Sequence, residues 1–186
     1  MPGQIKIDDG SGNYTVLTNG GSLGSDKTIT IPNTTGTMAL TSDSFGKVLQ
    51  VVQATTSTAT EVASTTYADS GLTADITPSA TSSKVLVIVS QNLEVSISDN
   101  GIKGYIKLLK DSTAIVTDSI VQILTGGASS NLMQLSHSIV YLDSPSTTSS
   151  LTYKTQMKVN DTSSFGKIRA QDESSPSTIT LIEVGA

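Results

Sequence analysis

The feature that most constrains this chain is an alternation of apolar and polar residues, clearest over residues 151–159 (LTYKTQMKV). Successive side chains of a β-strand point to opposite faces, so a period of two predicts a half-buried strand. The same alternation recurs over residues 93–97. Residues 85–89 (VLVIV) are instead apolar on both sides, which is typical of a strand that is covered on both faces.

Runs of strand length fill the chain from about residue 45 onward. Further strands are predicted at residues 47–54, 72–77, 102–109, 114–124, 132–142, 167–171 and 178–184. Clusters of Ser, Asp, Asn, Gly and Pro separate them, and no segment has the period of a helix. About eight to ten short strands in this length predict an all-β fold, an antiparallel β-sandwich of jelly-roll type.

Residues 1–44 differ in composition from residues 45–186. The first segment is rich in Gly, Asn, Ser and Thr and has only short apolar islands. Such islands can add a strand to a sheet, but they bury too little surface to fold alone. We therefore expect an extended N-terminal β arm over residues 1–44 that acts as an anchor, and a β-sandwich head over residues 45–186.

Composition argues against several classes of function. Cysteine is absent, which removes disulfides, thiolate metal sites and cysteine nucleophiles. The net charge is -5 and the 11 Lys and Arg residues are scattered, so no basic tract is available for nucleic-acid phosphates. The longest apolar run is far too short to span a bilayer, and the first residues do not form a signal peptide. We expect no nucleic acid, no membrane insertion and no cofactor.

Few residues have the chemistry of a catalytic site. His137 is the single histidine, no G-x-S-x-G motif is present, and Ser136 and Ser138 would point away from His137 in a strand. Asp172 and Glu173 form an acidic pair of the kind used in glycoside hydrolysis, but neighbouring strand residues point opposite ways. Aromatic residues are 4% of the chain and Trp is absent, so sugar-stacking surfaces are scarce. We predict that the chain is not an enzyme.

Other polar motifs have simple structural interpretations. Residues 8–13 (DDGSGN) carry oxygen ligands at loop spacing but lack the later bidentate Glu of an EF-hand, so they predict a turn between two strands. The Gly126-Gly127 stretch lacks the Lys and the following helix of a phosphate-binding loop. It is interpreted as a loop at one end of the sandwich. No metal site is predicted.

The N-terminal segment resembles proteins of bacteriophage particles. Residues 3–17 include an Asn-Tyr strand, and residues 25–40 (SDKTITIPNTTGTMAL) continue with the pattern T-x-T-x-P…G-T. This combination resembles a segment that is common in phage tail-fibre proteins.

The head resembles the C-terminal domains of phage fibres, many from marine phages. The stretches that carry this likeness are residues 46–53 (GKVLQVVQ), 71–87 and the closing strand at 177–184. Its motifs are structural, so the resemblance implies a role in the virion and transfers no catalytic residue.

The resemblance implies a β-rich homotrimer that is assembled in the host cytoplasm and becomes part of the virion. The function that follows is a fibre or spike displayed on the particle, with other tail or capsid proteins and a host-surface glycan as expected partners. A capsid decoration or cement protein and a carbohydrate-binding adhesin head are the alternatives. The sequence does not separate a tail location from a capsid location.

The closing strand is predicted to contact neighbouring subunits. Ile182 and Val184 share one of its faces, and Ile179 and Leu181 share the other with Glu183. Both faces are largely apolar, so one is expected to meet the opposing sheet and the other the copies of a trimer. Glu183 should reach solvent or a Lys or Arg, because an unpaired buried carboxylate is costly.

Two further groups of contact residues are predicted. Ile29, Ile31, Met38 and Leu40 of the arm are assigned to anchoring and assembly. Asp99, Asn100, Ser129, Ser130 and Asn131 are assigned to surface contacts, because binding residues of a rigid β scaffold usually lie on its loops.

Overall fold

The computed structural model describes residues 5–8, 14–17, 47–97, 103–122, 131–162 and 166–185. The chain divides into two compact units, Met1–Asp43 and Ser44–Ala186. In the first unit, β1 (Ile5–Asp8) and β2 (Tyr14–Leu17) form an antiparallel pair.

The residues predicted to act as an anchor, Ile29, Ile31, Met38 and Leu40, lie outside the described residues. Most of the predicted turn over residues 8–13 does so too, although the two strands that it joins are present. The anchoring role of the arm therefore stays a prediction.

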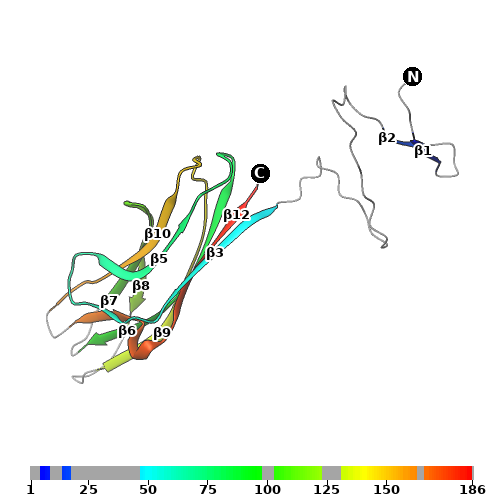
Figure 1. Ribbon diagram of the computed structural model, residues 1–186. Coiled ribbons are helices and arrows are strands. Elements are labelled where there is room, and N and C mark those ends of the chain that lie inside the picture. The colour runs from blue at the N-terminus through cyan, green and yellow to red at the C-terminus, as the bar shows by residue number, and fades with distance from the viewer. Residues whose placement is uncertain are drawn as a thin grey trace. The chain divides into compact units, whose positions relative to one another are not determined.

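The second unit is a two-layered antiparallel β-sandwich, as Figure 1 shows, which confirms the predicted all-β fold class. Its strands are β3 (Val48–Thr56), β4 (Thr60–Val62), β5 (Ala68–Ile76), β6 (Lys84–Ile97), β7 (Lys103–Lys110), β8 (Thr113–Gln122), β9 (Asn131–Asp143), β10 (Leu151–Val159), β11 (Lys167–Ala170) and β12 (Ser177–Val184). A short 3-10 helix, η2 (Asp172–Ser174), connects the last two strands. Sequence patterns did not identify β4 or η2, because segments of three residues have no measurable period.

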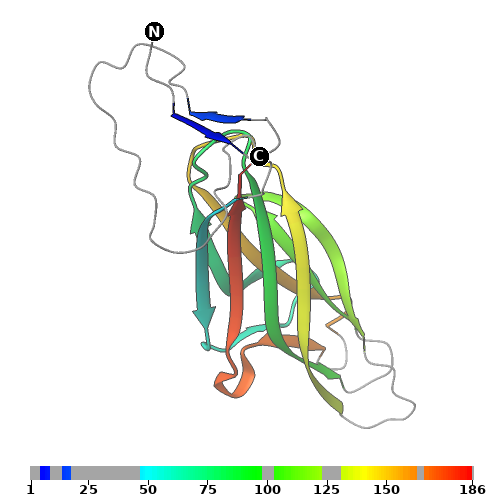
Figure 2. The same ribbon diagram turned by 90° about the vertical axis from the view of Figure 1, so that its right-hand side faces the viewer.

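The strand order is that of a jelly roll. One sheet runs β5-β10-β7-β8, and the other has β3, β12, β6 and β9 as neighbours, with β11 and β4 extending it. Without the short β4 and β11, the strands of the sandwich follow the order 1-8-3-6 in one sheet and 2-7-4-5 in the other. In Figure 2, β12 (red), β6 (green) and β9 (yellow) lie side by side in the larger sheet.

Strand β6 is one strand of 14 residues, although the sequence predicted two strands with a polar break between them. It pairs with β9 over its whole length, and on its other side first with β12 and then with β11. The polar break falls where β12 gives way to β11. There the buried Gln91 amide donates to Ser70 Oγ at 2.9 Å and accepts from Thr155 Oγ1 at 2.9 Å. These bonds let a polar residue face the core without interrupting the strand.

The inner faces of the two sheets form a continuous apolar core. Its most deeply buried members include Leu72, Val85, Val87, Val95, Ile106, Leu108, Tyr153, Met157, Ile168, Ile179 and Leu181. In β10 every second residue is buried, as the alternation predicted. The Tyr153 hydroxyl donates to Asp143 Oδ2 at 2.7 Å, and Lys110 forms an ion pair with Asp143 at 2.9 Å, so the polar end of this core tyrosine is satisfied.

Glu183 is fully buried, so the prediction that it reaches solvent or a Lys or Arg is wrong. Its carboxylate accepts hydrogen bonds from the Ser79 backbone N–H at 2.7 Å, from Ser79 Oγ at 2.6 Å and from Gln50 Nε2 at 2.6 Å. Burial alone raises the pKa of Glu183. The side chains of Ser79, Ser83 and Gln50 and the Ser79 N–H outweigh that effect and lower it to about 2. Uncharged hydrogen-bond donors thus stabilise the Glu183 carboxylate in place of the expected Lys or Arg.

We predict that Glu183 makes the sandwich sensitive to acid. Its folded-state pKa lies below its ordinary value of 4.5, so the stabilisation is complete above pH 4.5 and is lost as the pH falls toward 2. Glu183→Gln should lower the free energy of unfolding at pH 7 by roughly 3 kcal/mol, because an amide places N–H groups against these donors. Urea unfolding at pH 7 and pH 3 measures this difference. Glu173→Gln on the exposed η2 is the control, and an equal loss in both variants would contradict the prediction.

Candidate functional site

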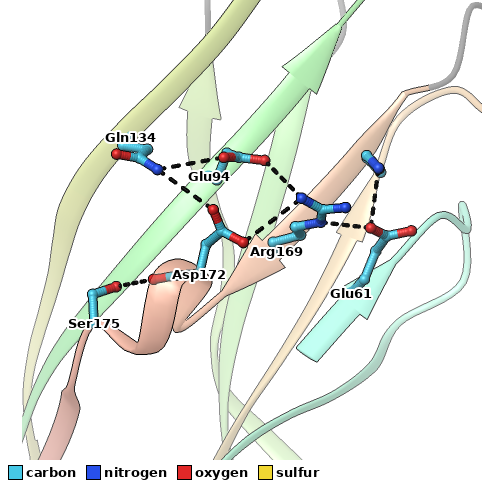
Figure 3. A network of polar contacts seen from close by, with 7 residues as sticks. Glu61, Glu94, Gln134, Arg169, Asp172 and Ser175 are labelled. Atoms are coloured by element: carbon cyan, nitrogen blue, oxygen red, sulfur yellow. Dashed lines mark hydrogen bonds and ion pairs between the residues drawn. The ribbon is translucent and has the colours of Figure 1, made fainter. Parts of the chain in front are cut away.

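Among the described residues, the largest group of interacting charges lies on the outer side of β6, β11 and β4 (Figure 3). Arg169 lies between three carboxylates, with its Nε 2.6 Å from Glu61 and its Nη1 3.5 Å from Glu94 and 3.6 Å from Asp172. Lys167 also contacts Glu61, at 3.1 Å. Strand pairing creates the cluster, because Arg169 stands directly opposite Glu61 on one side and Glu94 on the other.

Glu94 is the unusual member of this cluster, because it is buried while Glu61 is exposed. Burial raises the pKa of Glu94, and the neighbouring Asp172 raises it further. Gln134 and Arg169 act in the opposite direction. A carboxyl group with a raised pKa beside a second carboxylate is an arrangement found in glycosidases, where one acid donates a proton.

Glu94 does not line the depression that lies beside the cluster. A depression of about 380 Å³ lies next to the cluster, lined by Asn92, Leu93, Gln134, Leu135, Ser136, Asp172, Glu173 and Ser175. Asp172 and Glu173 border this depression, whereas Glu94 is 3% exposed and faces Arg169. A general acid must reach the glycosidic oxygen, and the Glu94 carboxyl is instead buried beside Arg169. The arrangement holds η2 against the sheet.

His137 has a partner that sequence reasoning missed. Ser119 Oγ of β8 lies 2.8 Å from His137 Nε2, and the pair links the edge strands of the two sheets. Ser136 and Ser138 are exposed on the opposite face of β9, as predicted. Burial lowers the pKa of His137, which favours the neutral ring. In the part of the chain that the structure describes, no carboxylate bonds this ring, so the pair lacks the third member of a triad.

The outer face of the larger sheet carries a second candidate site, which we call the apolar face. It consists of Leu49, Val51, Leu86, Ile88, Val140, Leu142 and Ile182. Strand register places them together. Val51, Ile182, Leu86 and Leu142 stand opposite one another in one row, and Ile88 and Val140 stand in the next. The two rows contain no charged residue.

The apolar face is large for a surface that meets only water. Val140 is 66% exposed, Val51 59% and Leu142 50%, and Leu49 and Ile88 are also exposed. Together they present roughly 500 Å² of apolar surface, a size at which the largest patch of a monomer is often functional. Standard interfaces bury about 800 Å² per partner, so the apolar face with its rim is of the size that a specific contact needs.

The residues predicted to form the trimer contact divide between the two sides of β12. Ile179 and Leu181 are fully buried in the core of their own sandwich, so they are not available for contact with another subunit. Ile182 and Val184 point outward and are half-buried, and Ile182 belongs to the apolar face. The sequence identified the two-sided apolar character of β12 but missed the exposed residues of β3 and β9. These residues can be recognised only from the row that they form with residues of β12 across the sheet, and that row is defined by the register of the strands.

The predicted loop contacts are not tested. Asp99, Asn100, Ser129 and Ser130 lie outside the described residues, and Asn131 is the first residue of β9. The described residues contain no helix that is long and apolar enough to cross a membrane. Within the same residues, no group of three or more acidic or His side chains is placed to hold a metal ion.

Comparisons with known proteins give a weak structural similarity. No protein-family model and no curated protein matches the chain. A chain of the infectious bursal disease virus Gx strain is 12% identical with a TM-score of 0.36, over 74% of this chain and 37% of that one. A mutant VP2 protein of the same virus, in T=1 particles, is 16% identical with a TM-score of 0.33, over 91% of this chain and 42% of that one. This chain thus spans less than half the length of those chains, and similarity at this level does not assign it to a family.

We predict that Arg169 stabilises the sandwich by compensating the buried Glu94. The folded-state pKa of Glu94 is already raised, so its ionisation costs stability as the pH rises above 4.5. Arg169→Met removes the opposing cation and should lower the free energy of unfolding at pH 7 by about 1 to 3 kcal/mol, with a smaller loss at pH 5. Urea unfolding at both pH values measures this. Lys167→Met is the matched control, and a loss for Arg169→Met that does not depend on pH would contradict the argument.

Proposed function

We propose that this chain is a structural subunit of a virus particle that assembles into a homotrimer through the apolar face. The observation that carries the proposal is this uncharged, exposed apolar surface on the outer side of an otherwise complete sandwich. Burying apolar surface stabilises a contact by about 25 cal/mol per Å². A face without charges fits other uncharged faces, and the other two copies of the chain in a trimer supply them.

The resemblance of residues 3–40 and of the head to phage fibre proteins supports a virion role and, within it, a fibre or spike. The jelly-roll order is compatible with that role, but folds of this kind serve many functions and do not identify one. The buried position of Glu94 and the incomplete Ser119–His137 pair support a subunit without catalytic activity. Immunogold labelling of particles separates a tail fibre from a capsid decoration protein, since the first labels tails and the second labels capsid facets.

We predict that one charge on the apolar face prevents trimer formation without unfolding the subunit. The wild-type chain should scatter light as three times its mass of 19.2 kDa at micromolar concentration. Val140→Lys should scatter as one chain, because Val140 is exposed in the subunit and the lysine would be desolvated only in the trimer. Thermal unfolding checks that the variant is folded.

The control for this experiment is Thr117→Lys, which adds the same charge at an exposed position of β8 in the other sheet. It should remain trimeric. A wild-type monomer at this concentration would exclude the homotrimer, and a trimeric Val140→Lys protein would exclude the apolar face as its contact.

We also predict that residues 1–44 attach the subunit to the particle. The compact unit Ser44–Ala186 contains the whole sandwich, so a chain without the first 44 residues should fold and keep its thermal stability. This truncated chain should no longer bind to particles that were assembled without the full-length protein. Co-sedimentation with such particles measures attachment, with the full chain as the positive control. Equal sedimentation of both proteins would show that the head itself is the anchor.

A further inference from the structure

The outer face of the smaller sheet carries an aromatic and cationic group, which we call the tyrosine–lysine cluster. It consists of Tyr67, Tyr105, Lys107 and Lys158. Lys107 Nζ lies 4.3 Å and Lys158 Nζ 4.6 Å from the centre of the Tyr67 ring, and Lys158 Nζ is also 5.2 Å from that of Tyr105. Both lysines are therefore within cation–π distance of the same ring.

The fold holds this ring in place across the sheet. Tyr67 immediately precedes β5, at one edge of the order β5-β10-β7-β8, while Asp118 belongs to β8 at the other edge. The Tyr67 hydroxyl donates to Asp118 Oδ1 at 2.5 Å, so the side chain spans the two central strands that carry the lysines. Asp118 has a φ of 49°, a left-handed conformation that accompanies the irregular register between β7 and β8.

The two lysines are neighbours on the sheet. Lys107 stands opposite Gln156 and Lys158 opposite Tyr105, so the lysines are diagonal neighbours on adjacent strands, about 7 to 8 Å apart along the backbone. Within the described residues, neither ammonium group forms an ion pair with a carboxylate. The nearby Asp69 is engaged by Lys154 at 2.9 Å and by Gln156 at 2.6 Å. An anion bound beside the lysines would gain Coulomb attraction from both of them.

We propose that the tyrosine–lysine cluster binds an acidic saccharide, with its carboxylate at Lys107 and Lys158. Tyr67 and Tyr105 are both half-buried, so each retains some apolar surface that a sugar ring can contact. The oxygens of Asp118 and Gln156 beside the lysines are acceptors for sugar hydroxyls. Two cations, two aromatic rings and nearby acceptors on one rigid sheet are the elements that such a ligand requires.

The surrounding charges favour a sugar over a nucleic acid. Asp69, Asp75 and Asp118 lie on the same sheet as the lysines, and the chain carries a net charge of -5. A polyphosphate places a charge at every residue and would meet these carboxylates, whereas an acidic polysaccharide presents separated charges between neutral hydroxyls. The cluster therefore fits single carboxylates in a polymer that is otherwise neutral.

The inference extends the proposed function and rests on it in one respect. If the apolar face of the larger sheet is buried between copies, the smaller sheet is the surface that an assembled subunit presents to its surroundings. Three clusters in one trimer would then bind a repeating polymer with avidity. Binding by a single subunit does not depend on assembly, so the two proposals can fail separately.

The test is calorimetric titration of the full chain with hyaluronan, in which carboxylate sugars alternate with neutral sugars, at low salt and with light scattering on the same samples. The wild-type protein should bind, with affinity that falls as salt is added. Replacing both lysines (Lys107→Gln and Lys158→Gln) should weaken binding at least about tenfold. It should leave the oligomeric state unchanged. The polymer should be recovered at its original length.

Matched controls decide between a specific and a general charge effect. Lys154→Gln removes a positive charge from the same face, but this lysine is already paired with Asp69, so the variant should bind as the wild type does. Neutral dextran and duplex DNA should bind much more weakly than hyaluronan. Absence of hyaluronan binding, an unchanged affinity in the double variant, or equal binding of dextran or DNA would each overturn the proposal. Loss of trimers with binding intact would instead overturn the assembly proposal alone.

Discussion

Strand β6 has two apolar sides, and a single sandwich can bury only one of them. Val85, Val87 and Val89 face the opposing sheet and are at most 1% exposed, whereas Leu86 and Ile88 between them point outward. Because β6 pairs with β9 on one side and with β12 and β11 on the other, it sets the register of the whole larger sheet. The same strand therefore organises the core and aligns the exposed residues of its neighbours into the apolar face.

The alternation of apolar and polar residues was sufficient to predict the fold class, since it indicated nearly every long strand. For β10 it also predicted the first and last residues that the structure shows. It failed where the outcome depended on partners that are distant in sequence. Glu183 had to be paired, but its donors come from Gln50 and Ser79, more than 100 residues away. Likewise Gln91 looked like a break in a strand, yet Ser70 and Thr155 bond it within the core. The periodicity of a sequence shows which side of a strand a residue faces. Only the folded structure shows which groups lie on that side.

The candidate sites were harder to predict for the same reason. Ile179 and Leu181 seemed equivalent to Ile182 and Val184, because the sequence does not say which apolar side of β12 is the inner one. The apolar face draws on four strands, and the tyrosine–lysine cluster joins Tyr67 to Lys107 and Lys158 through strand order and register. Neither set is a sequence motif. Each becomes recognisable only when the register shows that its members are neighbours.

The two outer faces of the sandwich differ in a way that the core does not require. Folding is satisfied by the inner residues of both sheets, so the outer residues could all be small and polar, as Ser and Thr are elsewhere in this chain. Instead, one face has aliphatic residues in water and the other has two lysines that share a tyrosine ring. Exposed aliphatic surface costs an isolated subunit free energy through its hydration, and two ammonium groups at one ring attract an anion. If each face binds the partner proposed for it, the chemistry of the faces calls for different ones: an apolar surface for the larger sheet and an anion for the smaller one.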